Sequence, residues 1–258
     1  MLFRSLLPAT VALAQMDPRQ ADAHAIHPLE RQQIANAVAT RQGEYAAGRL
    51  LARSLLNAFG GEDLPLINGP DRAPAWPPRI VGSITHCRSL CAVAIARSAD
   101  VLALGIDVEP AEPLPEDIAV RVLSSSERQC IARLPRPLRV LADRLVFSAK
   151  EATYKALYPS TKRFLDFPDL HVELHAAGTF TVTGADLASF AQGEIQGRYR
   201  ITGEHLATAL VVSAACRGVM TAAATTSAST AASGCAAPSE SRRPESAGPG
   251  AVSMSCEQ

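Results

Sequence analysis

The sequence predicts an α+β protein built as two lobes, and three observations lead to this class. Apolar residues recur at intervals of three and four between residues 28 and 58, which is the pattern of an amphipathic helix. Three short β-branched runs follow between residues 79 and 110, and further helical and alternating segments come after them. The acidic, proline-containing segment "AEPLPED", at 111–117, separates the two groups. We interpret it as the junction between an N-terminal and a C-terminal lobe.

Composition and charge narrow the class of protein. The 258 residues include 25 basic and 25 acidic side chains, and 47% are hydrophobic. This balance gives no electrostatic case for a nucleic-acid groove or an anionic membrane surface. No stretch has the roughly 18 uninterrupted apolar residues of a spanning helix. The six cysteines show no CxxC spacing, which favours free thiols in a cytoplasmic protein over a disulfide framework or a zinc site.

The N-terminal lobe is expected to begin with a strand. The first fifteen residues, "MLFRSLLPATVALAQ", resemble a secretory signal, but Pro8 interrupts an apolar run of only about nine residues. We expect a first β-strand here, and export remains the alternative. Residues 28–58 then predict one long helix that ends at the Gly60-Gly61 pair, followed by an ordered, proline-rich surface loop. The runs "RIVGSITHC", "LCAVAIARS" and "VLALGIDVEP" are expected to form one sheet.

The C-terminal lobe combines helices with a hairpin. Ser124 and Glu127 have the spacing of a capping box, and a second helix is predicted from about Arg139 through the stretch "FSAKEATYKAL". The alternating runs "LHVELHA" and "TFTVTG" predict a hairpin, and "HLATALVVSAAC" predicts a closing strand. The first run places three residues that could bind a metal on one strand face, which we interpret as a polar face rather than a zinc site. They are His171, Glu173 and His175.

The expected division is therefore an N-terminal lobe at 1–113 and a C-terminal lobe at 114–216. Beyond it, at 217–258, the composition changes to Ala, Ser, Thr, Gly and Pro with no periodic apolar pattern. Such a segment cannot bury enough apolar surface to order itself, so we predict a disordered tail.

The segment "GIDVEP" carries the first candidate site. The strand period of two puts Asp107 and Glu109 on one face, opposite two apolar residues. Two such charges about 4 Å apart repel by about 4 kcal/mol at an effective dielectric of about 20, so a partly buried pair needs a cation. Carboxylate oxygens suit Mg²⁺, which completes its shell with water and phosphate oxygens. A solvated strand end is the alternative, because the pattern is short and common.

The stretch "FSAKEATYKAL" carries the second candidate site. Ser148 with Glu151 fits a capping box, and Glu151 with Lys155 fits a helical ion pair, neither of which requires a function. The rest of the stretch is apolar on nearly all sides, so we expect the charged pair to face a cleft rather than open solvent. Joined to Asp107 and Glu109, it would form a magnesium site for a phosphate ester or anhydride.

These motifs together resemble a known family. The segments "GSITHC", "GIDVEP" and "FSAKEATYKALYP", in this order, are similar to those of 4'-phosphopantetheinyl transferases of the enterobactin synthetase component D type. The resemblance extends to "RQGEYAAGR", "DRAPAWP" and "TKRFLDF" and covers roughly residues 5 to 213. It implies a cytoplasmic monomer of two similar α+β lobes related by a pseudo-twofold axis, with coenzyme A and Mg²⁺ in the cleft between them.

The resemblance also implies a reaction and a set of site residues. Enzymes of this family move the phosphopantetheine arm of coenzyme A onto a serine of an apo acyl or peptidyl carrier protein, releasing adenosine 3',5'-bisphosphate, often for siderophore, peptide or polyketide synthesis. By motif position Asp107, Glu109 and Glu151 would be the metal ligands, and Lys155 would contact the diphosphate. Glu151 is also the candidate general base. The remaining coenzyme A contacts implied by the resemblance are Arg41, Arg49, Arg72, Thr85 and His86.

Two other functions remain open. The same acids would serve a magnesium-dependent hydrolase of a nucleotide or pyrophosphate, with water as the nucleophile. Alternatively, an inactive carrier-protein binding module would use the acids and the lysine only for capping and ion pairing.

Overall fold

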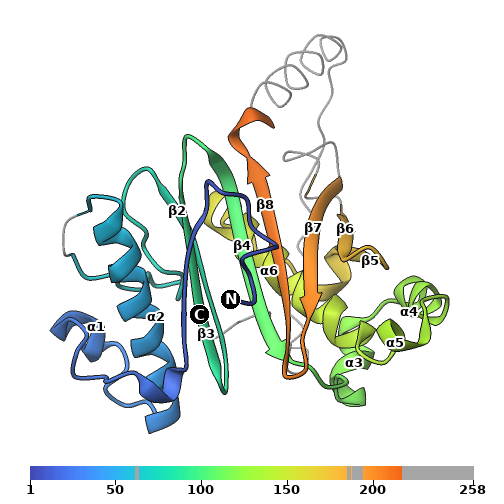
Figure 1. Cartoon of the computed structure of the whole chain (residues 1–258), viewed down its shortest axis with the longest axis horizontal. Coiled ribbons are helices and arrows are strands. Elements are labelled where there is room, and N and C mark those ends of the chain that lie inside the picture. Colours follow the sequence, from blue (N-terminus) through green and yellow to red (C-terminus); the bar gives the residue numbers. More distant parts are fainter. Residues whose placement is uncertain (62–63, 185–186, 188–193, 217–258) are drawn as a thin grey trace, which may run out of the picture.

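Two antiparallel sheets form the frame of the molecule (Figure 1). The computed structural model describes residues 1–61, 64–184, 187 and 194–216, so the predicted tail lies outside the described residues. The first sheet has the order β1-β3-β2, from Ala12–Met16, Leu90–Arg97 and Ile80–Cys87. The second sheet has the order β4-β8-β7-β6-β5, from Val101–Pro110, His205–Ser213, Glu194–Ile201, Thr179–Thr183 and His171–His175. The expected α+β class is confirmed.

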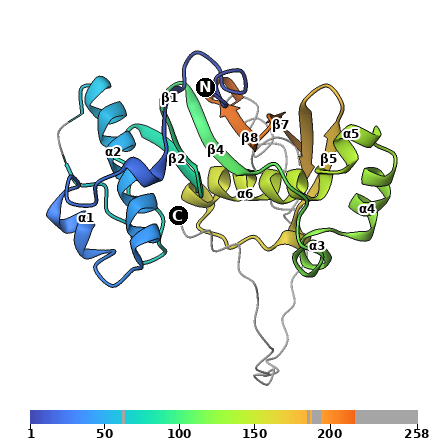
Figure 2. The same ribbon diagram turned by 60° about the horizontal axis from the view of Figure 1, so that its bottom comes forward.

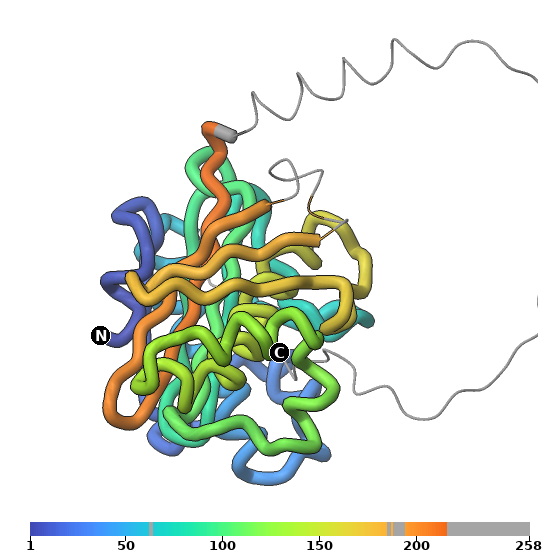
Figure 3. The backbone as a smooth tube through the Cα atoms, turned by 90° about the vertical axis from the view of Figure 1, so that its right-hand side faces the viewer, coloured from blue at the N-terminus to red at the C-terminus, as the bar shows by residue number. Residues whose placement is uncertain are grey.

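Helices cover each sheet separately. Helix α2, Ala39–Ala58, packs its apolar residues on the first sheet, with the short α1, Pro28–Gln32, beside it. Helix α6, Ala142–Thr161, packs on the second sheet. The short helices that accompany it are α3, Glu116–Val122, α4, Ser125–Ala132, and α5, Arg136–Arg139. Figure 3 shows the strands of the second sheet side by side, with α3 to α5 along one border. No described helix is long and apolar enough to cross a membrane.

Most of the predicted elements are present. The expected first strand is β1, and the side chains of Phe3, Leu6 and Val11 pack in the core with strand β4. The hairpin β5-β6 pairs as predicted, with His171 opposite Thr183. The capping box at Ser124 also forms, because its hydroxyl accepts from the backbone N–H of Glu127 and the Glu127 carboxylate accepts from the backbone N–H of Ser124.

The single long helix predicted at 28–58 is wrong, because the chain breaks it between α1 and α2. Gln33 lies in the break and bonds the loop ahead of β2: its amide accepts from the N–H of Asn68 and donates to the carbonyl of Asn68. The Tyr45 hydroxyl donates to the same Gln33 oxygen at 2.7 Å. Tertiary hydrogen bonds thus outweigh the apolar periodicity, which would have allowed an unbroken helix.

Strand β4 is the edge strand of the second sheet and lies next to β2 of the first. Its backbone pairs with β8, so it belongs to the second sheet, whereas the expected boundary at 113 puts it with the first lobe. On its other side β4 is joined to β2 by side chains rather than by a backbone ladder. The Ser83 hydroxyl accepts from the N–H of Ile106, and the Thr85 hydroxyl accepts from the N–H of Val108, both at 3.1 Å. The prediction that these three runs form one sheet is therefore wrong: β2 and β3 belong to the first sheet, and β4 is the edge strand of the second.

Candidate active site

Helix α6 lies directly across β4, and Gly105 allows this close approach. A Cβ atom at Gly105 would lie 1.8 Å from the carbonyl oxygen of Ala152 and 2.8 Å from the backbone nitrogen of Ala156. No side chain fits there, so the helix backbone rests on the strand. Figure 2 shows α6 as the central helix of the molecule, next to β4. Residues on the two facing surfaces are therefore held at short distances.

The face of α6 toward β4 carries polar and charged side chains. Positions three and four apart share one side of a helix. Three buried residues of this face contact the strand: Arg144, Ser148 and Lys155. Glu151 is buried at a helical spacing that puts it on the same face. On the strand, Asp107 and Glu109 follow Gly105 at intervals of two and so point to the same side. The prediction that both acids share one strand face agrees with their contacts to Lys155 and Arg144 of α6.

Asp107 is the centre of the site. It is 3% exposed, and its Oδ1 accepts from the Lys155 ammonium at 2.7 Å and from the Thr85 hydroxyl at 3.1 Å. The Lys155 ammonium also contacts the Thr85 hydroxyl at 3.5 Å. Residues from β2, β4 and α6, distant in the sequence, thus meet at one buried ion pair. Three predicted site residues, Asp107, Thr85 and Lys155, are brought together.

Ser148 completes the contacts of Asp107 and corrects one expectation. The capping box considered for Ser148 does not form, because α6 begins at Ala142, close to the start predicted near Arg139, and Ser148 is interior. Its hydroxyl donates to Asp107 Oδ2 at 2.7 Å. The helix extends further back than the capping pattern indicated because Ala142, Leu145 and Val146 bury their side chains in the core.

Glu109 contacts a residue that the sequence reasoning missed. The Arg144 guanidinium donates to Glu109 Oε2 at 2.7 Å and also to the carbonyl oxygens of Glu112 and Pro113. Burial, and then the charge of Asp107, raises the pKa of Glu109 to about 7, while Arg144 opposes this rise. The signal for Arg144 was its position one turn before Ser148 in the same predicted helix. The repulsion expected between the two strand acids is therefore present and only partly relieved.

The donor set fits a hard divalent cation in chemical type. Carboxylates of Asp107, Glu109 and Glu151 are oxygen ligands of the kind Mg²⁺ prefers. Glu151 is 2% exposed, on the helix face between Ser148 and Lys155. In the described part of the chain no three such residues are arranged closely enough to hold an ion. Asp107 and Glu109 are instead paired with Lys155 and Arg144.

The predicted phosphate contacts on the first lobe fall into two groups. Arg41 Nη1 lies 2.8 Å from His86 Nε2, and Glu44 lies 3.6 Å from His86 Nδ1. Since arginine only donates, His86 Nε2 accepts and the ring proton is on Nδ1, toward Glu44. Arg41 and His86 thus meet near the C-terminal end of β2, as expected for residues that share one ligand.

Arg49 and Arg72 lie elsewhere. Arg49 is 1% exposed, stacks over the Tyr45 ring at 4.0 Å and donates to the Asn68 side chain. Burial lowers the pKa of its guanidinium. Arg72 is exposed in the loop before β2, with a left-handed φ of 64°. Its neighbour Asp71 accepts from the Tyr158 hydroxyl at 3.1 Å and from the Lys162 ammonium at 2.9 Å, so this loop is tied to the end of α6.

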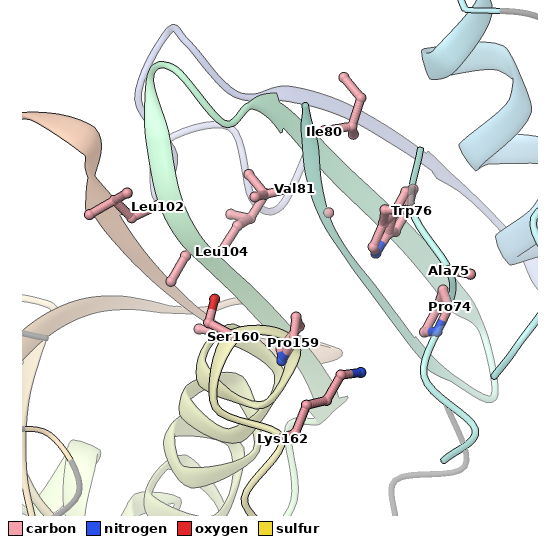
Figure 4. Close-up of a pocket in the computed structure, with 13 residues that line it drawn as sticks. Pro74, Ala75, Trp76, Ile80, Val81, Leu102, Leu104, Pro159, Ser160 and Lys162 are labelled. Atoms are coloured by element: carbon pink, nitrogen blue, oxygen red, sulfur yellow. The ribbon is translucent and has the colours of Figure 1, made fainter. Parts of the chain in front are cut away.

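A cavity of about 270 Å³ adjoins this loop (Figure 4). It lies between Pro74–Trp76, the start of β2 and β4, and the end of α6, and Lys162 stands at its border. A second, smaller cavity shares Pro74, Trp76 and Pro159 with it and reaches Lys155. Trp76 is the only tryptophan in the chain. Lys155 and Trp76 therefore line the same small cavity, and Trp76 can serve there as a natural fluorescent reporter.

Lys150, next to Glu151, was also missed by the sequence reasoning. It is fully buried and points away from β4: its ammonium donates to Glu127 at 3.0 Å and to the carbonyl oxygens of Val122 and Phe167. Glu127 in turn accepts from the N–H of Val172. Burial lowers the pKa of Lys150, and the Glu127 charge opposes this. The ion pair joins α6 to α4 and β5, and so fixes the helix that carries Glu151.

We expect Lys150→Met to lower the free energy of unfolding by about 3–5 kcal/mol, because it leaves the buried Glu127 charge without its partner. The double variant Lys150→Met with Glu127→Gln should recover part of this loss. Lys162→Met is the matched control, since Lys162 is exposed and its pair with Asp71 is worth at most about 1 kcal/mol. Urea denaturation measures all three. A loss for Lys150→Met no larger than for Lys162→Met would contradict the assigned role of this pair.

Comparison with known proteins identifies the family. Residues 29–96 match the 4'-phosphopantetheinyl transferase N-terminal domain, and residues 103–211 match the 4'-phosphopantetheinyl transferase superfamily. The second match begins at residue 103, within β4, and so groups most of this strand with the C-terminal part of the chain, as its backbone pairing with β8 does.

Named relatives agree with these matches. The 4'-phosphopantetheinyl transferase Svp of Streptomyces mobaraensis is 40% identical over 195 residues, 73% of this chain and 79% of that protein. PptT of Mycobacterium tuberculosis is 34% identical over 228 residues, 82% of this chain and 98% of that protein. Enterobactin synthase component D of Salmonella typhimurium, the type expected from the motifs, is 31% identical over 157 residues, 57% of this chain and 64% of that protein. The chain belongs to the 4'-phosphopantetheinyl transferase family and is an enzyme that transfers the 4'-phosphopantetheine arm to carrier proteins.

Proposed function

We propose that the facing surfaces of β4 and α6 bind the diphosphate of coenzyme A together with one Mg²⁺, in a cleft between two similar lobes. Asp107, Glu109 and Glu151 would hold the ion, and Lys155 would contact the diphosphate. The observation that carries the proposal is the meeting of Asp107, Thr85 and Lys155 within hydrogen-bond distance at a buried position. An ammonium held beside a carboxylate in a buried site is suited to bind a phosphate and a metal ion together.

The side chains would divide the reaction between them. The serine oxygen of the carrier attacks the β-phosphorus of coenzyme A, the new O–P bond forms, and the bond to the leaving adenosine 3',5'-bisphosphate breaks. The bound ion would supply charge stabilisation for the diphosphate oxygens. Lys155 would neutralise charge that develops on the same oxygens, from a position fixed by Asp107 and Thr85. Glu151 would take the serine proton, directly or through water, although its first role is metal ligation.

The first lobe would hold the nucleotide end. Arg41 and His86, already in contact, are the best supported residues for the 3'-phosphate, since an arginine fork binds phosphate with two parallel hydrogen bonds. Arg72 is exposed in the adjoining loop and remains a prediction. The phosphate contact of Arg49 also remains a prediction, and its guanidinium donates to the Asn68 side chain. Because the enterobactin relatives cover a smaller share of the chain than Svp and PptT, siderophore synthesis is one of several possible pathways.

The test is incubation with coenzyme A, Mg²⁺ and an apo carrier protein, followed by intact-mass spectrometry of the carrier. Transfer adds about 340 Da, the mass of the arm. Breakdown of coenzyme A with no change of the carrier would indicate a hydrolase. Carrier binding with intact coenzyme A would indicate an inactive binding module. A panel of acyl and peptidyl carriers in the same assay would identify the preferred partner.

Coenzyme A binding should change the fluorescence of Trp76, because this single tryptophan borders the cavities next to Lys155. Dephospho-coenzyme A, which lacks the 3'-phosphate, should require about 10- to 100-fold higher concentration, since hydrogen bonds to a charged group contribute about 1.5–3 kcal/mol. Titration of the wild type and of Arg41→Gln measures this difference. Equal affinity of the wild type for both compounds would contradict the proposed phosphate contacts of Arg41 and His86.

A further inference from the structure

Ser148 contacts the central carboxylate from the side opposite to Lys155. Asp107 Oδ1 accepts from Lys155 and Thr85, whereas Oδ2 accepts from the Ser148 hydroxyl at 2.7 Å. Ser148 is fully buried and Asp107 is nearly so. Each carboxylate oxygen therefore has its own donors. Those of Oδ1 come from α6 and β2, and that of Oδ2 comes from a position two turns earlier on α6.

The hydrogens in this cluster can be assigned by counting. The one hydrogen of the Ser148 hydroxyl points to Asp107 Oδ2, while the other oxygen of this carboxylate is paired with the Lys155 ammonium. Thr208 is opposite Asp107 in the β4-β8 ladder, and its hydroxyl lies 2.9 Å from both the hydroxyl and the carbonyl oxygen of Ser148. With Ser148 already donating, the Thr208 hydroxyl must be the donor in both contacts, which share its one hydrogen. Ser148 is thus held in place by Thr208 and is directed at Asp107.

Another buried hydroxyl on the same helix behaves differently. Thr153 is also fully buried, and its hydroxyl donates to the carbonyl oxygen of Ala149 at 2.7 Å, within its own helix. This is the common local bond of a helical threonine. Ser148 instead sends its hydrogen across to β4. The difference indicates that the Ser148 hydroxyl serves Asp107 rather than the helix.

The Ser148 contact fixes the plane of the Asp107 carboxylate. The terminal torsion of an aspartate is broad, so a carboxylate held only through Oδ1 can turn about its Cβ–Cγ bond. Mg²⁺ demands nearly ideal octahedral geometry, and hydrogen bonds to a ligating carboxylate change metal affinity by about 10- to 100-fold when they are removed. We propose that Ser148 is a positioning residue that acts through Asp107 and sets the carboxylate orientation for the divalent ion. This inference rests on the proposed metal site.

The test compares Ser148→Ala with Thr153→Val. Each variant removes one fully buried hydroxyl from α6, but only the first removes a contact to Asp107. Mn²⁺ binding is measured by electron paramagnetic resonance on the full chain with coenzyme A present and no carrier, so that no turnover occurs. We expect Ser148→Ala to raise the Mn²⁺ dissociation constant about 10- to 100-fold. Thr153→Val should stay within about twofold of the wild type, a change of about 0.4 kcal/mol at most.

A second readout separates positioning from damage to the fold. The Mg²⁺ concentration for half-maximal transfer should rise in Ser148→Ala by the same factor as the Mn²⁺ constant, and excess Mg²⁺ should restore most of the maximal rate. An unchanged Mn²⁺ constant in folded Ser148→Ala would overturn the inference while leaving the transferase function intact. Should Ser148→Ala not fold, Ser148→Cys replaces the hydroxyl with a much weaker donor of similar size, so the Mn²⁺ constant should still rise, and an unchanged constant in folded Ser148→Cys would also overturn the inference. A wild-type enzyme that binds no Mn²⁺ with coenzyme A would overturn the metal site and the inference together.

Discussion

Asp107→Asn should reduce carrier modification by at least about a hundredfold while the protein stays folded. The substitution removes a proposed metal ligand and the partner of Lys155, and such charge stabilisation contributes several kcal/mol to phosphoryl chemistry. Asparagine is the better replacement because alanine would remove the oxygen to which the buried Lys155 ammonium donates, whereas asparagine keeps an acceptor there. The measurement is the initial rate of arm transfer, read by intact mass. Glu151→Gln should show a loss of similar size.

The matched control for these two variants is Glu173→Gln, which neutralises an exposed carboxylate on β5. It should retain the wild-type rate within about twofold, because surface substitutions away from special contacts change stability by about 0.5 kcal/mol or less. Circular dichroism and thermal melting verify the fold of each variant. If Asp107→Asn kept a rate within tenfold of the wild type, the role assigned to this carboxylate would be wrong.

Gly105→Ala should both destabilise the protein and impair transfer. The new methyl group would meet the backbone of α6, with the Ala152 carbonyl oxygen at 1.8 Å, so the helix must move away from β4. Overpacking of a buried contact costs about 1–3 kcal/mol, and the upper end applies here because the obstacle is backbone rather than a flexible side chain. The displacement would also separate Glu151 and Lys155 from Asp107, so we expect at least about a hundredfold loss of rate.

Gly203→Ala is the control for this substitution, because a Cβ atom at Gly203 meets nothing within 4 Å. Its free energy of unfolding should stay within about 0.5 kcal/mol of the wild type. Urea denaturation and the transfer rate are measured for both variants. Equal stability of the two alanine variants would show that α6 does not rest on β4 as described.

The local elements were largely predictable from the sequence because their signals are local. Apolar β-branched runs predicted β2, β3 and β4, and the serine-glutamate spacing predicted the start of α4. The break between α1 and α2 was not predictable, since it depends on the bonds of Gln33 with the distant Asn68. The sheet to which β4 belongs was not predictable either, because strand pairing between residues about a hundred positions apart leaves no mark in either segment.

The site was predictable in its residue types and not in its contacts. The strand period placed Asp107 and Glu109 on one face, and the charged pair of an otherwise apolar helix indicated Glu151 and Lys155 before the family motif assigned them roles. Arg144 and Ser148 were missed as functional residues because their roles arise only when α6 lies across β4, where one binds Glu109 and the other Asp107. Their spacing of about one turn places both on one helix face, but nothing in the sequence shows which strand residues that face would meet.

The most direct test of the account is a crystal structure with coenzyme A and Mn²⁺ as an anomalous substitute for Mg²⁺. The account predicts one anomalous peak between β4 and α6, with carboxylate oxygens of Asp107, Glu109 and Glu151 at about 2.1 Å and the diphosphate completing the shell together with water. Lys155 should then contact the diphosphate, and Ser148 should remain on Asp107. An ion bound elsewhere, or a diphosphate that touches neither Asp107 nor Lys155, would contradict the proposed site.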